Sequence, residues 1–171
     1  MTHSGRKAEE RLYEPVKRAL EGYFGQDDHI ALALEVTADR FSPQMKHFLN
    51  DDTLFLVENR ELRPDIFGKV GPDARQAFGY SDFLVTAEVK SGVPTVNDIF
   101  QAKKYGELYH AFFSFLISTK LPEERVIRLL RHNPVLLFYS GISTAYMCRY
   151  SEESERFDWW FSEREPRKKN I

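Results

Sequence analysis

Two acidic residues and a lysine occupy positions from which they could bind a metal ion and act on water. Asp65 follows Pro64 at the start of an apolar-rich segment, and Glu88 and Lys90 end a second segment of that kind. Two carboxylates that lie close together repel each other until a proton or a cation relieves them. Oxygen ligands suit Mg²⁺, which binds through one or two carboxylates and keeps several waters and substrate phosphate oxygens. With Lys90 to orient or help deprotonate the attacking water, these side chains are the parts of metal-assisted phosphodiester hydrolysis.

Strand alternation predicts that these side chains share one face, because successive residues of a strand point to opposite sides. Glu88 and Lys90 are then neighbours about 7 Å apart along the strand, at about 3.3 Å per residue. The opposite face of residues 81–90 is wholly apolar and consists of Phe83, Val85, Ala87 and Val89. Asp65 falls on the more polar face of the preceding segment, so pairing of the two segments as a hairpin would bring Asp65 and Glu88 to one point.

Length and composition predict one domain with a proper core. The chain has 171 residues, of which 42% are hydrophobic and 29% are charged, as in globular proteins that are neither disordered nor fibrous. A net charge of -2 provides no global basic signal for nucleic acid, although the charge at a groove matters more than the total. Cys148 is the single cysteine, which excludes an intramolecular disulfide and a Cys-rich zinc site and favours an intracellular location.

No stretch of the sequence approaches the roughly 18 apolar residues of a membrane span. The most apolar stretch, Ala111–Thr119, is too short, and Met1–Glu10 is polar rather than signal-like. We therefore expect a cytoplasmic protein without a membrane partner.

The chain before the hairpin predicts a helix and a strand that could each add an acid to the site. Residues 6–24 predict a helix with a kink or a restart at Pro15, since an interior proline costs about 3 kcal/mol. Glu9 lies on the core-facing side of this helix, where it either serves the site or complements the helix dipole. Residues 29–37 predict a strand in which Glu35 is either a further acid near the site or a solvated residue.

Between that strand and the hairpin, the sequence predicts two short elements. Ser42 and Pro43 suit the cap and the first position of a helix through Leu49. Residues 54–57 predict a short strand.

After the hairpin, Thr95 and Asp98 form a capping-box pattern with Asp in place of Glu, which predicts a helix over residues 95–110. Lys103 and Lys104 of this helix either form a solvated face or contact a nucleic-acid phosphate backbone. The later elements are a buried strand at 111–119, a helix at 121–132, strands at 135–139 and 144–150, aromatic residues at 157–161, and a basic end at 167–169. In the helix at 121–132, Leu129 is predicted to face inward, and an outward stripe consists of Arg125, Arg128 and Arg131. Together these elements predict an α/β (α+β) fold, with a mixed central β-sheet flanked by helices.

At these residues the chain resembles the PD-(D/E)XK nuclease superfamily, which has the restriction-endonuclease-like fold. The resemblance rests on Pro64-Asp65, on Glu88-Val89-Lys90 at the end of an apolar strand, and on Gln101 and Tyr105 in the following helix. It covers about residues 6–119 of a single domain, 1–171, and implies an αβββαβ core there. Residues 120–162 then form a C-terminal extension with a helix and extra strands, and residues 163–171 form a basic tail.

The Glu-x-Lys element gains its weight from this context. Ten lysines, each with about a 26/171 chance of an acid two places before, predict roughly 1.5 such elements by chance, and Glu88 with Lys90 is the one found. A second Pro-Asp, Pro72-Asp73, lies in a Gly-containing connection where a turn is a sufficient explanation. Asp65 is therefore the preferred partner.

The resemblance implies a role for each matched residue. Asp65 and Glu88 would be ligands of Mg²⁺, for which Mn²⁺ can substitute, with the Val89 carbonyl as a third. Lys90 would act on the water, Glu9 would support the metal or the water, and Gln101 would hold Lys90 or the substrate phosphate. The competing interpretation of Asp65, Glu88 and Lys90 is a surface ion pair.

The expected function is thus that of a Mg²⁺-dependent endonuclease, with DNA favoured over RNA because the superfamily acts mostly on DNA. The alternative is a non-catalytic nucleic-acid-binding or assembly subunit that retains the fold. A third possibility is a nuclease that needs a separate recognition partner or a homodimer, because the sequence contains no recognisable reader domain.

Overall fold

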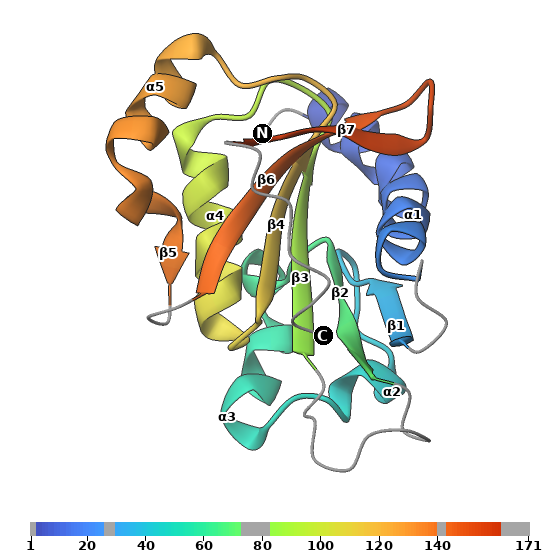
Figure 1. Ribbon diagram of the computed structural model, residues 1–171. Helices are drawn as coiled ribbons and strands as arrows, with labels where there is room; N and C mark the ends of the chain where they lie inside the picture. Colours follow the sequence, from blue (N-terminus) through green and yellow to red (C-terminus); the bar gives the residue numbers. More distant parts are fainter. Residues whose placement is uncertain (1–2, 26–29, 73–82, 140–142, 162–171) are drawn as a thin grey trace.

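Helices lie on both faces of a central sheet in the computed structural model, which describes residues 3–25, 30–72, 83–139 and 143–161 (Figure 1). The α-helices are α1 (His3–Phe24), α2 (Pro43–Lys46), α3 (Asp51–Leu54), α4 (Val96–Leu108) and α5 (Glu124–His132). The strands are β1 (Ile30–Val36), β2 (Ile66–Pro72), β3 (Phe83–Lys90), β4 (Phe113–Ser118), β5 (Phe138–Tyr139), β6 (Ser143–Ser151) and β7 (Arg156–Trp160). Short 3₁₀ turns are η1 (Phe55–Glu58), η2 (Arg60–Leu62) and η3 (Pro134–Leu137). The predicted mixed sheet flanked by helices is confirmed.

Seven strands form the described part of the sheet, in the order β1-β2-β3-β4-β6-β5, with β7 also paired to β6. Strand β2 is antiparallel to both β1 and β3, whereas β3, β4 and β6 run parallel to one another. A parallel pair needs a crossover, and α4 provides it between β3 and β4. Strands β5 and β7 are antiparallel to β6.

One face of the sheet packs under α1. Val16, Leu20 and Phe24 of this helix are fully buried against the apolar side of β3, where Val85 and Ala87 are also fully buried. The predicted apolar face of this strand is therefore confirmed.

The expected restart of the first helix at Pro15 is wrong, because one helix runs from His3 to Phe24 with Pro15 inside it. Leu12 and Val16, on either side of the proline, are both buried in the same core. Burial of a continuous apolar stripe offsets the cost of an interior proline.

The opposite face of the sheet packs under α4 and α5, and Figure 1 shows these helices across the sheet from α1. Gly106 of α4 faces the ring of Tyr139, and a Cβ built at Gly106 would lie 2.5 Å from that ring. Only glycine lets this helix approach so closely. Next to it, Phe41, Phe67 and Tyr109 pack as an aromatic cluster under the same helix.

The predicted strand at residues 54–57 is wrong. The Asn50 side chain accepts a hydrogen bond from the Thr53 N–H at 2.9 Å and starts α3, which continues directly into η1. A capping side chain therefore directs this short apolar run into helical turns.

Two later predictions are also corrected, and one strand was not predicted. Residues 134–137 form η3 rather than a strand, so that only Phe138–Tyr139 pairs with β6. Leu129, predicted to face inward, is 38% exposed. Residues 156–160 form β7, a strand that the sequence pattern did not indicate. This strand pairs with β6 across a register shift between Arg149 and Tyr150.

Several predictions fall on positions outside the described residues. These positions are Asp73 with the rest of the connection at 73–82, the Ser140-Gly141 junction, and the basic tail at 163–171. Within the part of the chain that is described, no helix has the length and apolarity needed to cross a membrane.

Candidate active site

The predicted site residues gather where β3 ends, toward the upper end of that strand in Figure 1. Pairing of β2 with β3 sets Ile66 opposite Ala87, so Asp65, one residue earlier, lies beside Glu88. The first half of α1 and the start of α4 close over this point, because Glu9 and Asp98 both reach Lys90. Four elements distant in the sequence thus contribute to one buried cluster.

Asp65 is held on both its backbone and its side chain. Its carbonyl accepts from the Thr37 N–H at 2.8 Å, and its Oδ2 accepts from the Val89 N–H at 2.8 Å. Burial raises the pKa of Asp65 above its ordinary value, although the bonds from Val89 and from the Tyr13 hydroxyl oppose that rise. The carboxylate is therefore fixed in place, and protonation competes with any cation there.

Glu88 and Lys90 form the closest ion pair of the cluster. Glu88 Oε1 lies 2.7 Å from Lys90 Nζ, and the two residues are 3% and 5% exposed. Burial, followed by the neighbouring charge of Asp65, raises the pKa of Glu88 even though Lys90 opposes the rise. These residues are thus not the surface ion pair of the competing interpretation.

Lys90 has two further acidic neighbours. Its Nζ lies 3.6 Å from Asp98 Oδ1 and 3.8 Å from Glu9 Oε1. Burial lowers the pKa of Lys90, but the charges of Glu88, Glu9 and Asp98 outweigh it, so the pKa is raised overall. Because an ammonium held in this way accepts no proton, Lys90 suits orientation of water and stabilisation of charge better than deprotonation.

Glu9 extends the cluster from α1. It is 9% exposed, and the backbone of Ser91 also hydrogen-bonds to it. Burial raises the pKa of Glu9, while Lys90 lowers it. The first-helix acid thus lies within the cluster and does not merely complement the helix dipole.

Asp98 is the site residue whose position the sequence did not indicate. Its Oδ2 accepts from the Thr95 N–H and hydroxyl, both at 2.7 Å, as the capping box predicts. The same carboxylate presents Oδ1 to Lys90. In the sequence, the capping box was a sufficient explanation of Asp98. The one further signal for a place in the site was the short turn after Lys90, which keeps the start of the next helix near the end of β3.

Gln101 lies one turn after Asp98 and donates through Nε2 to the Tyr105 hydroxyl at 3.0 Å. The Gln-x-x-x-Tyr pattern thus corresponds to a real contact within α4. Asp98, rather than Gln101, is the residue of this helix that pairs with Lys90.

Two other candidates take part in local structure. Lys103 and Lys104 are both half-buried on α4. The Nζ of Lys104 donates a hydrogen bond to the Glu61 carbonyl at 3.1 Å. Glu35 Oε1 accepts from the Ser42 N–H at 2.7 Å, so this acid anchors the loop before α2 instead of serving the site or standing free in solvent.

The donor set at Asp65 and Glu88 consists only of oxygen atoms. Among the residues that the structure describes, no group of three or more His, Cys, Asp or Glu side chains has the arrangement of a metal site. Carboxylate oxygens are the kind of ligand that Mg²⁺ prefers, since this ion binds through one or two carboxylates and keeps most of its coordination for water and phosphate.

Comparisons with protein-family models, with curated proteins and with solved structures find no match to this chain. The geometry of the site is therefore the basis for inferring its function.

Proposed function

We propose that this chain is a divalent-metal-dependent nuclease of the PD-(D/E)XK type, which hydrolyses phosphodiester bonds in nucleic acid, DNA in preference to RNA. The observation that carries the proposal is the buried cluster of Asp65, Glu88 and Lys90, with Glu9 beside it. The chain order α1, β1, β2, β3, α4, β4 supports it, because that order and the pairing of these strands agree with an αβββαβ core. The preference for DNA comes from the resemblance alone.

The charge balance of the site favours a bound cation. Asp65 and Glu88 both have a raised pKa, because burial disfavours both ionised forms and the charge of Asp65 further disfavours that of Glu88. A divalent cation relieves that repulsion, and Asp65, Glu88 and the Val89 carbonyl would hold it. When bound, Mg²⁺ or Mn²⁺ polarises the phosphate and lowers the pKa of a water molecule.

The chain's own residues would position the reaction. The Val89 N–H and the Tyr13 hydroxyl fix the Asp65 carboxylate, so that its free lone pairs keep one direction. Lys90 remains an ammonium, which can donate to the attacking water and stabilise negative charge as it develops on the phosphate. Glu9 and Asp98 hold that ammonium in place from two helices.

A satisfied ion-pair network also fits the second candidate, a non-catalytic nucleic-acid-binding or assembly subunit. In the described part of the chain, every buried side-chain nitrogen or oxygen atom has a hydrogen-bond partner. A cluster that is complete in this way could serve stability alone. The two candidates differ in whether the cluster binds divalent metal and breaks phosphodiester bonds.

A cleavage assay distinguishes the nuclease from the non-catalytic subunit. Plasmid and single-stranded oligonucleotide should be cut in the presence of Mg²⁺ or Mn²⁺, and left intact in EDTA. Asp65→Asn and Lys90→Ala should lose at least about 100-fold in rate, since each removes a group that acts on the reacting atoms. Glu124→Gln, an exposed acid on α5, is the control and should cut as wild type does. Intact substrate with every metal, together with no divalent binding by calorimetry, would favour the assembly role.

A further inference from the structure

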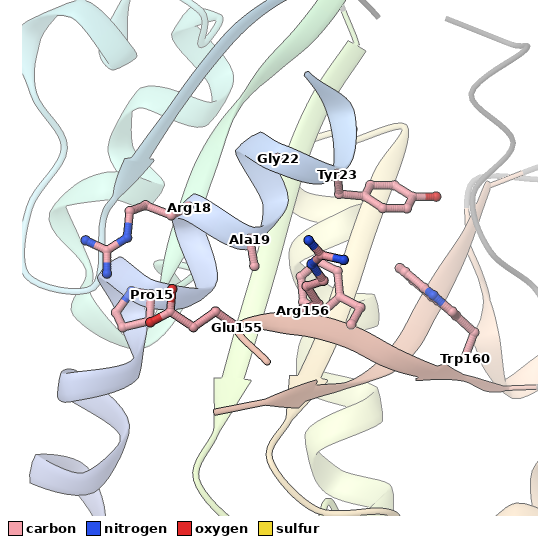
Figure 2. A pocket seen from close by; sticks show the side chains of 9 residues that line it. Pro15, Arg18, Ala19, Gly22, Tyr23, Glu155, Arg156 and Trp160 are labelled. Atoms are coloured by element: carbon pink, nitrogen blue, oxygen red, sulfur yellow. The ribbon is translucent and has the colours of Figure 1, made fainter. Parts of the chain in front are cut away.

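A groove runs between α1 and the β6–β7 hairpin, away from the acidic cluster (Figure 2). It encloses about 500 Å³, which lies within the range of small-molecule sites. Its lining consists of Pro15, Arg18, Ala19, Gly22 and Tyr23 of α1, with Glu155, Arg156, Phe157 and Trp160 from the hairpin.

One wall of the groove is aromatic. The rings of Tyr23 and Trp160 lie 5.4 Å apart, and those of Phe157 and Trp160 lie 5.6 Å apart. Trp160 is half-buried, so part of its indole faces the groove, while Tyr23 is buried behind it. Such a wall suits a flat, apolar ring system.

The rim of the groove carries two exposed guanidinium groups and one carboxylate. Figure 2 shows Arg156 reaching from β7 toward α1, with Tyr23 and Trp160 to one side of it and with Arg18 and Glu155 toward the other end. The net charge of these three rim groups is positive by one. An arginine beside an aromatic surface is the combination that binds a phosphate next to a stacked base.

We propose that this groove binds an unpaired nucleotide of a single-stranded nucleic acid, with its base against Trp160 and its phosphate on Arg156. Arg18 contacts a neighbouring phosphate of the same strand. The inference rests on the proposed function, because it names the form of the substrate that the acidic cluster cuts. A base that stacks on a protein ring must first leave its duplex, so the preferred substrate is single-stranded or locally unpaired.

Helix α1 connects the groove to the acidic cluster. Glu9 belongs to the cluster and Arg18 to the groove, and the nine helical steps from one to the other correspond to about 14 Å along the helix axis and about half a turn around it. Arg11 lies on the same side of the helix as Arg18 and is 67% exposed on its side chain. A strand that contacts both the groove and the cluster must therefore pass around α1 and span more than about four nucleotides, whereas a mononucleotide cannot reach both.

The test uses steric blocking of the groove from Gly22. This glycine is exposed, and a Cβ built there meets no atom within 4 Å, so larger side chains fit without disturbing α1. Gly22→Phe should fill the groove, while Gly22→Ala adds one methyl group and leaves it open. Binding is measured in EDTA by fluorescence polarisation of a labelled oligo(dT), so that no cleavage occurs.

The expected result is a loss of affinity of about tenfold or more for Gly22→Phe and for Arg156→Ala, as for loss of one stacked base or its phosphate contact. Arg128→Ala, at an exposed arginine of α5, should bind as wild type does. Gly22→Ala should lose much less affinity than Gly22→Phe, because it adds only one methyl group to the groove. Glu155→Gln should bind more tightly, because it removes a negative charge from the rim. A duplex of the same sequence should bind more weakly than the single strand, and dTMP more weakly still.

Equal affinity of wild type, Gly22→Phe and Arg156→Ala overturns the groove assignment, and so does a preference for duplex or equal binding of dTMP. These outcomes are independent of catalysis. Tight binding that Gly22→Phe abolishes, together with no cleavage in Mg²⁺, would sink the nuclease proposal and leave the groove standing. If Gly22→Phe cleaves single strands at the wild-type rate at subsaturating substrate, the nuclease proposal stands and the groove assignment is overturned.

Discussion

The two faces of β3 are buried to the same degree but are built in opposite ways. On the α1 side, Val85, Ala87 and Val89 are at most 1% exposed, and their side chains belong to the apolar core. On the α4 side, Glu88 and Lys90 are 3% and 5% exposed and are ionisable groups 2.7 Å apart. Apolar burial stabilises the fold in proportion to area, whereas buried ion pairs often cost more in desolvation than they return. The charged face is therefore poorly explained by stability, which favours a chemical role for it.

The largest difference between the faces should appear when a charge is moved from one to the other. Val89→Asp places an unpaired carboxylate in the apolar core under α1 and should reduce the free energy of unfolding by at least about 4 kcal/mol. Urea denaturation followed by circular dichroism measures this loss. Val93→Asp, at a position 45% exposed, is the control and should stay within about 0.5 kcal/mol of wild type. A mild effect at Val89 would mean that the two faces do not differ as described.

Removal of the central cation should cost somewhat less. Lys90→Met leaves Glu88, Glu9 and Asp98 without their shared ammonium, and breaking a buried pair in this way costs about 3–5 kcal/mol. The loss should be larger at pH 8 than at pH 5, because the orphaned carboxylates can take up protons at the lower pH. Unfolding curves at both pH values, with Lys103→Met as control, test this. A loss that is the same at both pH values would contradict the charge account.

Glu88→Gln should reveal the cost of ionising Glu88 in the absence of metal. The folded state holds a proton on Glu88 more tightly than the unfolded state does, because its pKa is raised. Stability is therefore lost as pH rises from the ordinary carboxyl value near about 4 through the raised pKa. Glutamine cannot ionise, so the variant should gain on wild type as pH rises from about 4.5 to the raised pKa of about 8, at about 1.36 kcal/mol per pH unit and thus by a few kcal/mol in total. Unfolding in EDTA between pH 5 and pH 9 measures the gain, and a constant difference would refute it.

The smallest effect on the free energy of unfolding is expected at the solvent-exposed side of α1. A substitution there serves as a reference for the substitutions on the two faces of β3. Gly22 is exposed within the helix and has open space around it. Gly22→Ala should raise the free energy of unfolding by about 0.5–1 kcal/mol, by reducing the conformational freedom of the unfolded chain. Thermal unfolding tests this, and a lowered midpoint would show that Gly22 has a structural role.

The sequence predicted the pairing of Asp65 with Glu88 because that pairing depends only on alternation and on a hairpin. Both are local properties that place the two acids on one face, and the register of Ile66 opposite Ala87 then sets Asp65 beside Glu88. The helix after β3 was predictable for the same reason, since Thr95 and Asp98 form its cap within three residues.

What the sequence could not show depends on packing between distant elements. Tyr13 reaches Asp65 only because α1 crosses the end of β2, and Asp98 reaches Lys90 only because α4 starts directly over that residue. Strand β7 forms through pairing with β6 across a register shift. The aromatic residues at 157–161 show no strand periodicity by themselves, so the sequence did not predict this strand. Tertiary contacts between distant elements thus determine the positions of Tyr13 and Asp98 in the site and form the groove between α1 and the β6–β7 hairpin.

The central claim is that Asp65, Glu88 and Lys90 form a metal-dependent hydrolytic centre. Its most direct test is the single-turnover rate of oligonucleotide cleavage across a titration of Mg²⁺, for wild type and for Glu88→Gln, with unfolding curves to check that the variant is folded. The wild-type rate should rise and saturate with Mg²⁺, and the Glu88→Gln rate should be at least about 100-fold lower at every concentration. Equal rates for the two proteins, or a wild-type rate that does not depend on Mg²⁺, would contradict the claim.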